Sequence, residues 1–107
     1  MLPIVKQIAN EFKAELKRLY GNELSDLILF GSHVRGDFND DSDIDFALVL
    51  KNPSTTSTSE IMKVSDLGNE LSNKYGKFVS YIGIPEYKLH NSQLGLYQEI
   101  RNEGIRI

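Results

Sequence analysis

Two aspartates, Asp43 and Asp45, open the apolar run Asp-Ile-Asp-Phe-Ala-Leu-Val-Leu. In an extended strand, side chains two residues apart point to the same face, so both carboxylates would share one small volume. Like charges this close are unfavourable unless a cation neutralises them, and hard oxygen ligands suit magnesium or manganese. The pair therefore predicts a divalent metal site held by Asp43 and Asp45.

A second signal, Gly31-Ser32, follows directly on another apolar run, Leu-Ile-Leu-Phe. Glycine lets the backbone come close to a ligand, and a helix starting near Ser32 would aim free N–H groups and its positive end at a phosphate. The Ser32 hydroxyl would add a donor. Because magnesium keeps coordination positions for phosphate oxygens, the turn and the carboxylate pair together predict a nucleotide site.

Two further residues, Arg35 and Ser42, lie close to these signals in the sequence. Arg35 stands one helical turn after Ser32, where its guanidinium would either reach the same phosphates or hold the acidic link in place. Ser42 precedes the first carboxylate and could orient it. The acidic residues of the turn-rich link itself are interpreted as mainly structural: Asp37, Asp40 and Asp41.

These signals gain weight from their combination. A lone Gly-Ser pair is usually only a turn, and a lone Asp-x-Asp is usually a solvated strand end. Here the end of a strand, Gly-Ser, an arginine, a short acidic link and Ser-Asp-x-Asp all fall within residues 30–46. We therefore favour a functional interpretation of this segment.

The pattern Gly-Ser, two residues, Arg-Gly, a variable link and Ser-Asp-x-Asp resembles the nucleotidyltransferase superfamily that includes DNA polymerase β, specifically its minimal MNT-type members. The matching positions are Gly31, Ser32, Arg35, Gly36, Ser42, Asp43 and Asp45. The ending LYQEIRNEGIRI also looks like the close of many minimal members. The resemblance implies a polymerase β-like fold.

The same resemblance implies roles for these residues. Gly31 and Ser32 would hold the triphosphate of ATP or another nucleoside triphosphate, and Asp43 and Asp45 would carry one or two magnesium ions for attack on the α-phosphate. Minimal members resemble antitoxins that are encoded beside HEPN-domain ribonucleases, where they adenylylate a tyrosine of the toxin or mask it by binding. A HEPN-type partner protein is therefore expected.

One part of the family pattern is missing. Active members generally carry a third carboxylate on a later strand, which helps to bind the second metal and to activate the incoming hydroxyl. The segment where we expect it, KFVSYIGI at 77–84, has no acid, and Ser80 stands about at its place. Glu86 lies beyond the strand and is interpreted as a solvated charge. His33 and His90 lack metal-ligand spacing and are interpreted as surface or turn residues.

The elements that must position these residues follow from periodicity. Apolar residues every three or four positions predict helices over 4–20 and over 61–75, the second opened by a capping box at Ser57 and Glu60. Strands are predicted at 24–30, 43–50 and 77–84, the second central because its tail is apolar on both faces. Short helices are predicted from Pro85 onward and over 94–102, with a polar loop at 51–59.

This order predicts a single α/β domain over residues 1–107, a small mixed sheet with helices packed against it. Periodicity leaves the relative direction of the first two strands open. The scattered basic residues and the net charge of -3 make a nucleic-acid partner unfavoured. With no cysteine, no apolar leader and no run of membrane-spanning length, we expect a cytoplasmic protein without membrane association. A homo-oligomer is left open.

Two functions and a plain structural alternative follow. The first is an enzyme that transfers a nucleoside monophosphate from Mg-NTP to a hydroxyl, expected on a partner protein. The second is an antitoxin that neutralises its partner by binding, with a weakened or inactive site, which Ser80 favours. The third, a structural domain, ranks last because it needs both motifs to coincide by chance.

Overall fold

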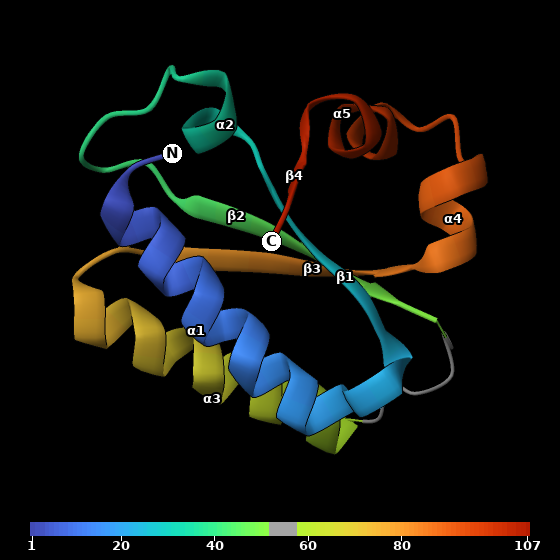
Figure 1. Cartoon of the computed structure of the whole chain (residues 1–107), viewed down its shortest axis with the longest axis horizontal. Helices are drawn as coiled ribbons and strands as arrows, with labels where there is room; N and C mark the ends of the chain where they lie inside the picture. Colours follow the sequence, from blue (N-terminus) through green and yellow to red (C-terminus); the bar gives the residue numbers. More distant parts are fainter. Residues whose placement is uncertain (52–57) are drawn as a thin grey trace.

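The computed structural model of the chain describes residues 1–51 and 58–107, without the side chains of residues 58–61. The strands form a sheet, and helices lie on both sides of it (Figure 1). Their bounds are α1 Pro3–Tyr20, η1 Gly21–Glu23, β1 Leu24–Phe30, α2 Ser32–Arg35, β2 Ile44–Leu50, α3 Thr58–Tyr75, β3 Val79–Pro85, α4 Glu86–Asn91, α5 Gly95–Glu103 and β4 Ile105–Arg106.

Within the described residues, four strands form one mixed sheet in the order β3-β2-β1-β4. β1 runs antiparallel to both β2 and β4, whereas β2 and β3 run parallel. The predicted α/β class with a small mixed sheet is confirmed, and so is the central position of β2. The direction of the first two strands, which periodicity left open, is antiparallel.

Two long helices, α1 and α3, lie side by side against one face of the sheet (Figure 1). The apolar stripe predicted for the first helix is buried, with Ile8, Phe12 and Leu16 fully shielded from solvent. The Phe12 ring meets Phe46 of β2 edge to face, with 5.3 Å between ring centroids. This face holds the larger apolar cluster, because the two helices that cover it have 18 residues each, whereas α4 and α5 on the other face are shorter.

The shorter helices α4 and α5 lie on the other side of the sheet (Figure 1). Ile28 and Val49 of the sheet pack there with Leu89 of α4 and Ile100 of α5. The chain leaves α5 at Gly104, as the sequence predicts, and then pairs with β1 as β4. α5 lies near the end of the sheet that carries the predicted site, since Glu99 of α5 contacts Arg35, whereas α4 follows β3 at the opposite end.

Some boundaries differ from the sequence expectation. The second strand begins at Ile44 and the third covers Val79–Pro85, since the ladder between them starts where Ile44 N–H donates to Phe78 O at 2.9 Å. β4 was not predicted, because two residues carry no readable periodicity. The predicted loop at 51–59 and the capping box of Ser57 and Glu60 fall largely on positions outside the described residues.

Among the described segments, no helix combines the length and the apolar character that crossing a membrane requires.

Candidate functional site

Three strands bring the Gly-Ser turn, the carboxylates and Ser80 to one end of the sheet. The last residue of β1, Phe30, pairs with Asp45 of β2 in the antiparallel ladder. On its other side Asp45 pairs with Ser80 of β3 in the parallel ladder. Asp45 therefore stands between the turn at Gly31 and Ser80.

The two carboxylates belong to the face of the sheet that α4 and α5 partly cover. Phe46 and Leu48 pack toward α1 and α3, whereas Ala47 and Val49 belong to the cluster on the opposite face. Because side chains alternate along a strand, Asp45 shares the face of Ala47 and Val49. Asp45 is half-buried, and Asp43, which directly precedes the strand, is exposed.

Gly31 is in contact with the Asp45 side chain. Its φ of 83° and ψ of -154° are disfavoured for every residue with a Cβ, and that conformation lets α2 start directly after β1. A Cβ built on Gly31 would lie 2.5 Å from Asp45 Oδ2. Glycine is therefore required here twice, for its backbone conformation and for the space that the carboxylate occupies.

We predict that Gly31→Ala destabilises the fold by roughly 2 to 3 kcal/mol through backbone strain and the collision with Asp45. Gly36→Ala is the matched control, since Gly36 also has a positive φ, 88°, but nothing lies within 4 Å of its Cβ position. We expect Gly36→Ala to destabilise the fold by roughly 1 kcal/mol. Urea unfolding of both variants measures the difference, and equal losses would contradict a role for the contact with Asp45.

Burial raises the pKa of the Asp45 carboxyl, and the nearby charge of Asp43 raises it further. The charge of His33 and a hydrogen bond from Ser80 act in the opposite direction, but they do not cancel the effect. The ionised form of Asp45 is thus unfavourable in the protein alone. A bound cation would remove this penalty, because it offsets both the lost hydration and the repulsion.

Arg35 is held by acidic groups on two sides. Its Nε lies 3.3 Å from Asp37 Oδ2, and one terminal nitrogen lies 2.6 Å from Glu99 Oε1 of α5. Of the two roles that the sequence left open, the structure displays the one that anchors the acidic link. Glu99 was not singled out from the sequence, because 64 residues separate it from Arg35 and only the tertiary fold brings them together.

Ser42 closes a turn within the acidic link. Its Oγ accepts the Asn39 N–H at 2.9 Å, and the Ser42 N–H donates to Asn39 O at 3.1 Å. Asp41 N–H donates to the Asn39 side chain at 2.8 Å. The hydroxyl of Ser42 therefore shapes the backbone that leads into Asp43, and the structural interpretation of Asp37 fits its ion pair with Arg35.

His33 corrects one expectation from the sequence. It lies in the one-turn helix α2, but its side chain is buried, with 7 % of its surface exposed. The surface interpretation failed because the acidic link folds back over α2 and Phe38 stacks on the imidazole. Glu86, interpreted as a solvated charge, is partly buried at the start of α4 and accepts a hydrogen bond from Ser25 at 3.1 Å.

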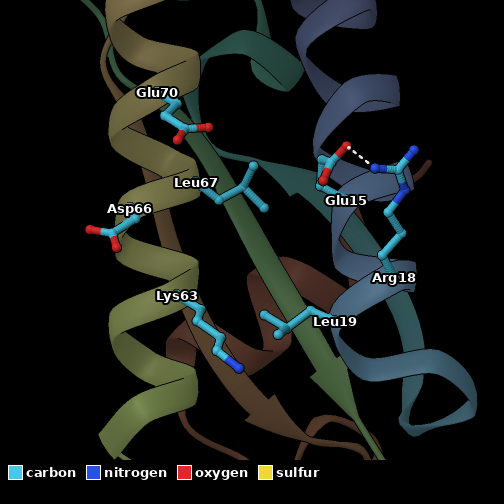
Figure 2. A pocket seen from close by; sticks show the side chains of 7 residues that line it. All are labelled: Glu15, Arg18, Leu19, Lys63, Asp66, Leu67 and Glu70. Carbon is cyan, nitrogen blue, oxygen red and sulfur yellow. Dashed lines mark ion pairs between the residues drawn. The ribbon is translucent and has the colours of Figure 1, made fainter.

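A surface hollow of about 390 Å³ lies between α1 and α3 (Figure 2). Leu19 and Leu67 point into it, and the Glu15–Arg18 ion pair, at 3.4 Å, lies at its side. This hollow is on the face opposite to Asp45. The carboxylate pair and the Gly-Ser turn are the better candidate site, because Asp45 lies against Gly31 at the end of the sheet. Among the described residues, no group of three His, Cys, Asp or Glu could hold a metal without further ligands.

Comparison with known proteins shows the family to which the chain belongs. The nucleotidyltransferase domain family matches residues 9–107. A protein of Methanocaldococcus jannaschii named "Putative protein adenylyltransferase" is 30% identical over 101 residues, which span 94% of this chain and 96% of the relative. A second protein of that name from the same organism is 31% identical over 96 residues, 88% of each chain.

Solved structures share the fold. A structure described as a toxin-antitoxin with AMP-PNP superposes with a TM-score of 0.60 at 21% identity, over 90% of this chain and 69% of that one. A structure described as a "putative minimal nucleotidyltransferase" superposes with a TM-score of 0.61 at 16% identity, over 96% and 95% of the two chains. At these identities the superpositions establish the fold alone.

Proposed function

Since the chain belongs to the nucleotidyltransferase domain family, we propose that it binds Mg-NTP, with ATP as the expected nucleotide, and transfers the nucleoside monophosphate to a hydroxyl of a partner protein. The observation that carries this proposal is the position of Asp45. It lies against Gly31 on one side and pairs with Ser80 on the other. The Gly-Ser turn, the carboxylate pair and Ser80 therefore meet at one end of the sheet.

The carboxylate pair suits a hard divalent cation. Asp43 and Asp45 offer oxygen ligands from positions two residues apart, and the raised pKa of Asp45 has burial and the charge of Asp43 as its main causes. Magnesium keeps positions for phosphate oxygens, so two protein carboxylates are enough to hold it together with a triphosphate. Bound there, magnesium would neutralise charge on the phosphates during the reaction.

The start of α2 would hold the phosphates. Val34 and Arg35 N–H groups donate to Gly31 O, so the amides of Ser32 and His33 precede the first helical hydrogen bonds. Such amides have no acceptor within the helix, and anions bind to them readily. The Ser32 hydroxyl is partly exposed and would add a donor. Arg35 would reach phosphate only by giving up Glu99 or Asp37, and Ser42 would act by shaping the backbone before Asp43.

The reaction makes one bond and breaks one. The acceptor hydroxyl oxygen bonds to the α-phosphorus, the bond from that phosphorus to the bridging oxygen breaks, and pyrophosphate leaves. With phosphates at Gly31, on the β1 side of Asp45, attack opposite to the leaving group comes from the β3 side. Ser80 is a poor base there, so the hydroxyl proton passes to solvent and positioning supplies most of the rate.

The acceptor class is supported by relatives. Two relatives carry the name protein adenylyltransferase, and structures that share the fold are toxin-antitoxin proteins, one with AMP-PNP. We propose that this chain acts on a HEPN-type partner and serves as its antitoxin. The alternative is neutralisation by binding alone, and Ser80 at the place of the third carboxylate is the observation that favours it.

A transfer assay separates these functions. The purified chain and the protein encoded beside it are incubated with magnesium and α-labelled ATP, with the double variant Asp43→Ala/Asp45→Ala in parallel. We expect label on the partner with the natural chain and none with the double variant. If no label appears while both proteins bind the partner equally well, transfer is ruled out and neutralisation by binding stands.

A further inference from the structure

The buried imidazole of His33 connects α2 to the link that carries Ser42. Its ring stacks on Phe38, with 4.7 Å between centroids and 19° between the ring planes. Its Nε2 lies 3.4 Å from Ser42 O. Its Nδ1 is buried and has no hydrogen-bond partner among the described residues. The ring of His33 thus contacts Phe38 and Ser42, two residues of the link that leads to the carboxylate pair.

The contact with Ser42 determines which nitrogen carries the hydrogen. A carbonyl oxygen only accepts, so Nε2 must be the donor. The contact with the Ser42 carbonyl therefore requires a hydrogen on Nε2, and Nδ1 points away from this contact without a partner among the described residues.

The Ser42 carbonyl belongs to the peptide unit that also contains the Asp43 nitrogen. Because a peptide unit is planar, fixing that oxygen fixes the orientation in which the chain enters Asp43. On the other side, Ile44 N–H donates to Phe78 O at 2.9 Å. Asp43 itself is exposed, so these two backbone anchors, rather than packing of its own side chain, position it.

We propose that His33 is a positioning residue for the carboxylate pair: by holding the Ser42 carbonyl it sets Asp43 at the distance from Asp45 that one cation can bridge. The inference rests on the proposed function, since it assumes that a cation binds there. Partners that orient metal ligands commonly contribute about 10- to 100-fold to metal affinity. Loss of the Nε2 contact should weaken cation binding by a similar factor.

Two substitutions at His33 separate the hydrogen bond from the ring. The amide nitrogen of His33→Gln reaches about as far as Nε2, whereas that of the shorter His33→Asn corresponds to Nδ1. Both variants lose the stacking on Phe38 alike. We expect the Gln variant to bind the cation nearly as tightly as the natural chain and the Asn variant to bind it roughly 10- to 100-fold more weakly.

The measurement is calorimetric titration of the full chain with α,β-methylene-ATP, once with Mn²⁺ in excess and once with EDTA. The weakening in His33→Asn should appear with Mn²⁺ and vanish with EDTA. The inference would be overturned if the Gln and Asn variants bound the nucleotide equally tightly with Mn²⁺. It would also be overturned if His33→Asn weakened nucleotide binding equally with Mn²⁺ and with EDTA. If His33→Asn does not fold, the Gln variant decides alone: affinity near that of the natural chain supports the inference, and a 10-fold loss refutes it.

Failure of the proposed function gives a different result. In that case the natural chain itself would bind no more nucleotide with Mn²⁺ than with EDTA, and Asp45→Asn would change nothing. A natural chain that binds in an Mn²⁺- and Asp45-dependent way, beside His33 variants that all bind equally, would refute only the role of His33.

Discussion

Asp45→Asn should lower nucleotidyl transfer by roughly 1,000-fold while making the chain more stable in the absence of divalent cations. A metal site supplies several kcal/mol of transition-state charge stabilisation, and about 4 kcal/mol corresponds to that factor. Asparagine keeps the shape of the side chain beside Gly31 and Ser80 but removes the charge. Initial rates with α-labelled ATP and the acceptor measure the loss.

The gain in stability follows from the sign of the pKa shift. Burial and the charge of Asp43 raise the pKa of Asp45 in the folded chain above its unfolded value. The stability associated with protonated Asp45 is therefore fully present below the ordinary carboxyl pKa near 4 and is lost as the pH rises through the higher folded pKa. Asp45→Asn does not lose this stability. In EDTA its free energy of unfolding should therefore exceed that of the natural chain by an amount that grows as the pH rises through this range and then levels off.

A divalent cation should act in the opposite direction and stabilise the natural chain more than Asp45→Asn. Magnesium at about ten times its Kd should add about 1.4 kcal/mol to the unfolding free energy of the natural chain and little to that of the variant. Asp41→Asn is the control, because Asp41 is exposed in the acidic link and its amide, not its carboxylate, holds the turn. Should Asp45→Asn and the natural chain respond equally to magnesium, the carboxylate pair would not be the metal site.

Which features of this structure can be predicted from the sequence alone depends on how far apart in the sequence the contacting residues lie. Helices and strands follow from periodicity within single segments, and the family pattern indicates that Ser80 stands about at the place of the third carboxylate. The burial of His33 and the pairing of Arg35 with Glu99 cannot be predicted in either way. Both arise when the acidic link and α5 fold onto α2, and residues 64 positions apart leave no periodic signal for that contact.

In the candidate site, too, some features can be predicted from the sequence and others depend on tertiary contacts. Residue types identified Gly31, but the reason for glycine there, a Cβ position 2.5 Å from Asp45 Oδ2, is a tertiary property. Likewise the sequence left two roles open for Arg35, and only the position of α5 shows which acids surround it. Local chemistry can thus be predicted from spacing, whereas the tertiary contacts that hold these residues in place, such as that of Glu99 with Arg35, cannot.

Ser80→Asp should raise the transfer rate by roughly 100- to 10,000-fold, the range that a general base typically contributes. Ser80 is the register partner of Asp45 on the parallel neighbour strand, and both belong to the same face of the sheet. A carboxylate at this position would lie on the acceptor side, where the hydroxyl must lose its proton. Rates with the partner protein at saturating magnesium and ATP measure the gain.

The same substitution should weaken the fold when no cation is present, because a third negative charge would join Asp43 and Asp45. Ser65→Asp serves as the matched control: Ser65 is exposed on α3, so it adds the same charge away from the site. An increase in rate and a magnesium-dependent recovery of stability, both specific to Ser80→Asp, would mean that the natural serine keeps an otherwise competent site slow. A folded, magnesium-binding Ser80→Asp chain that transfers no faster would instead favour neutralisation by binding, since the site would then lack more than its base.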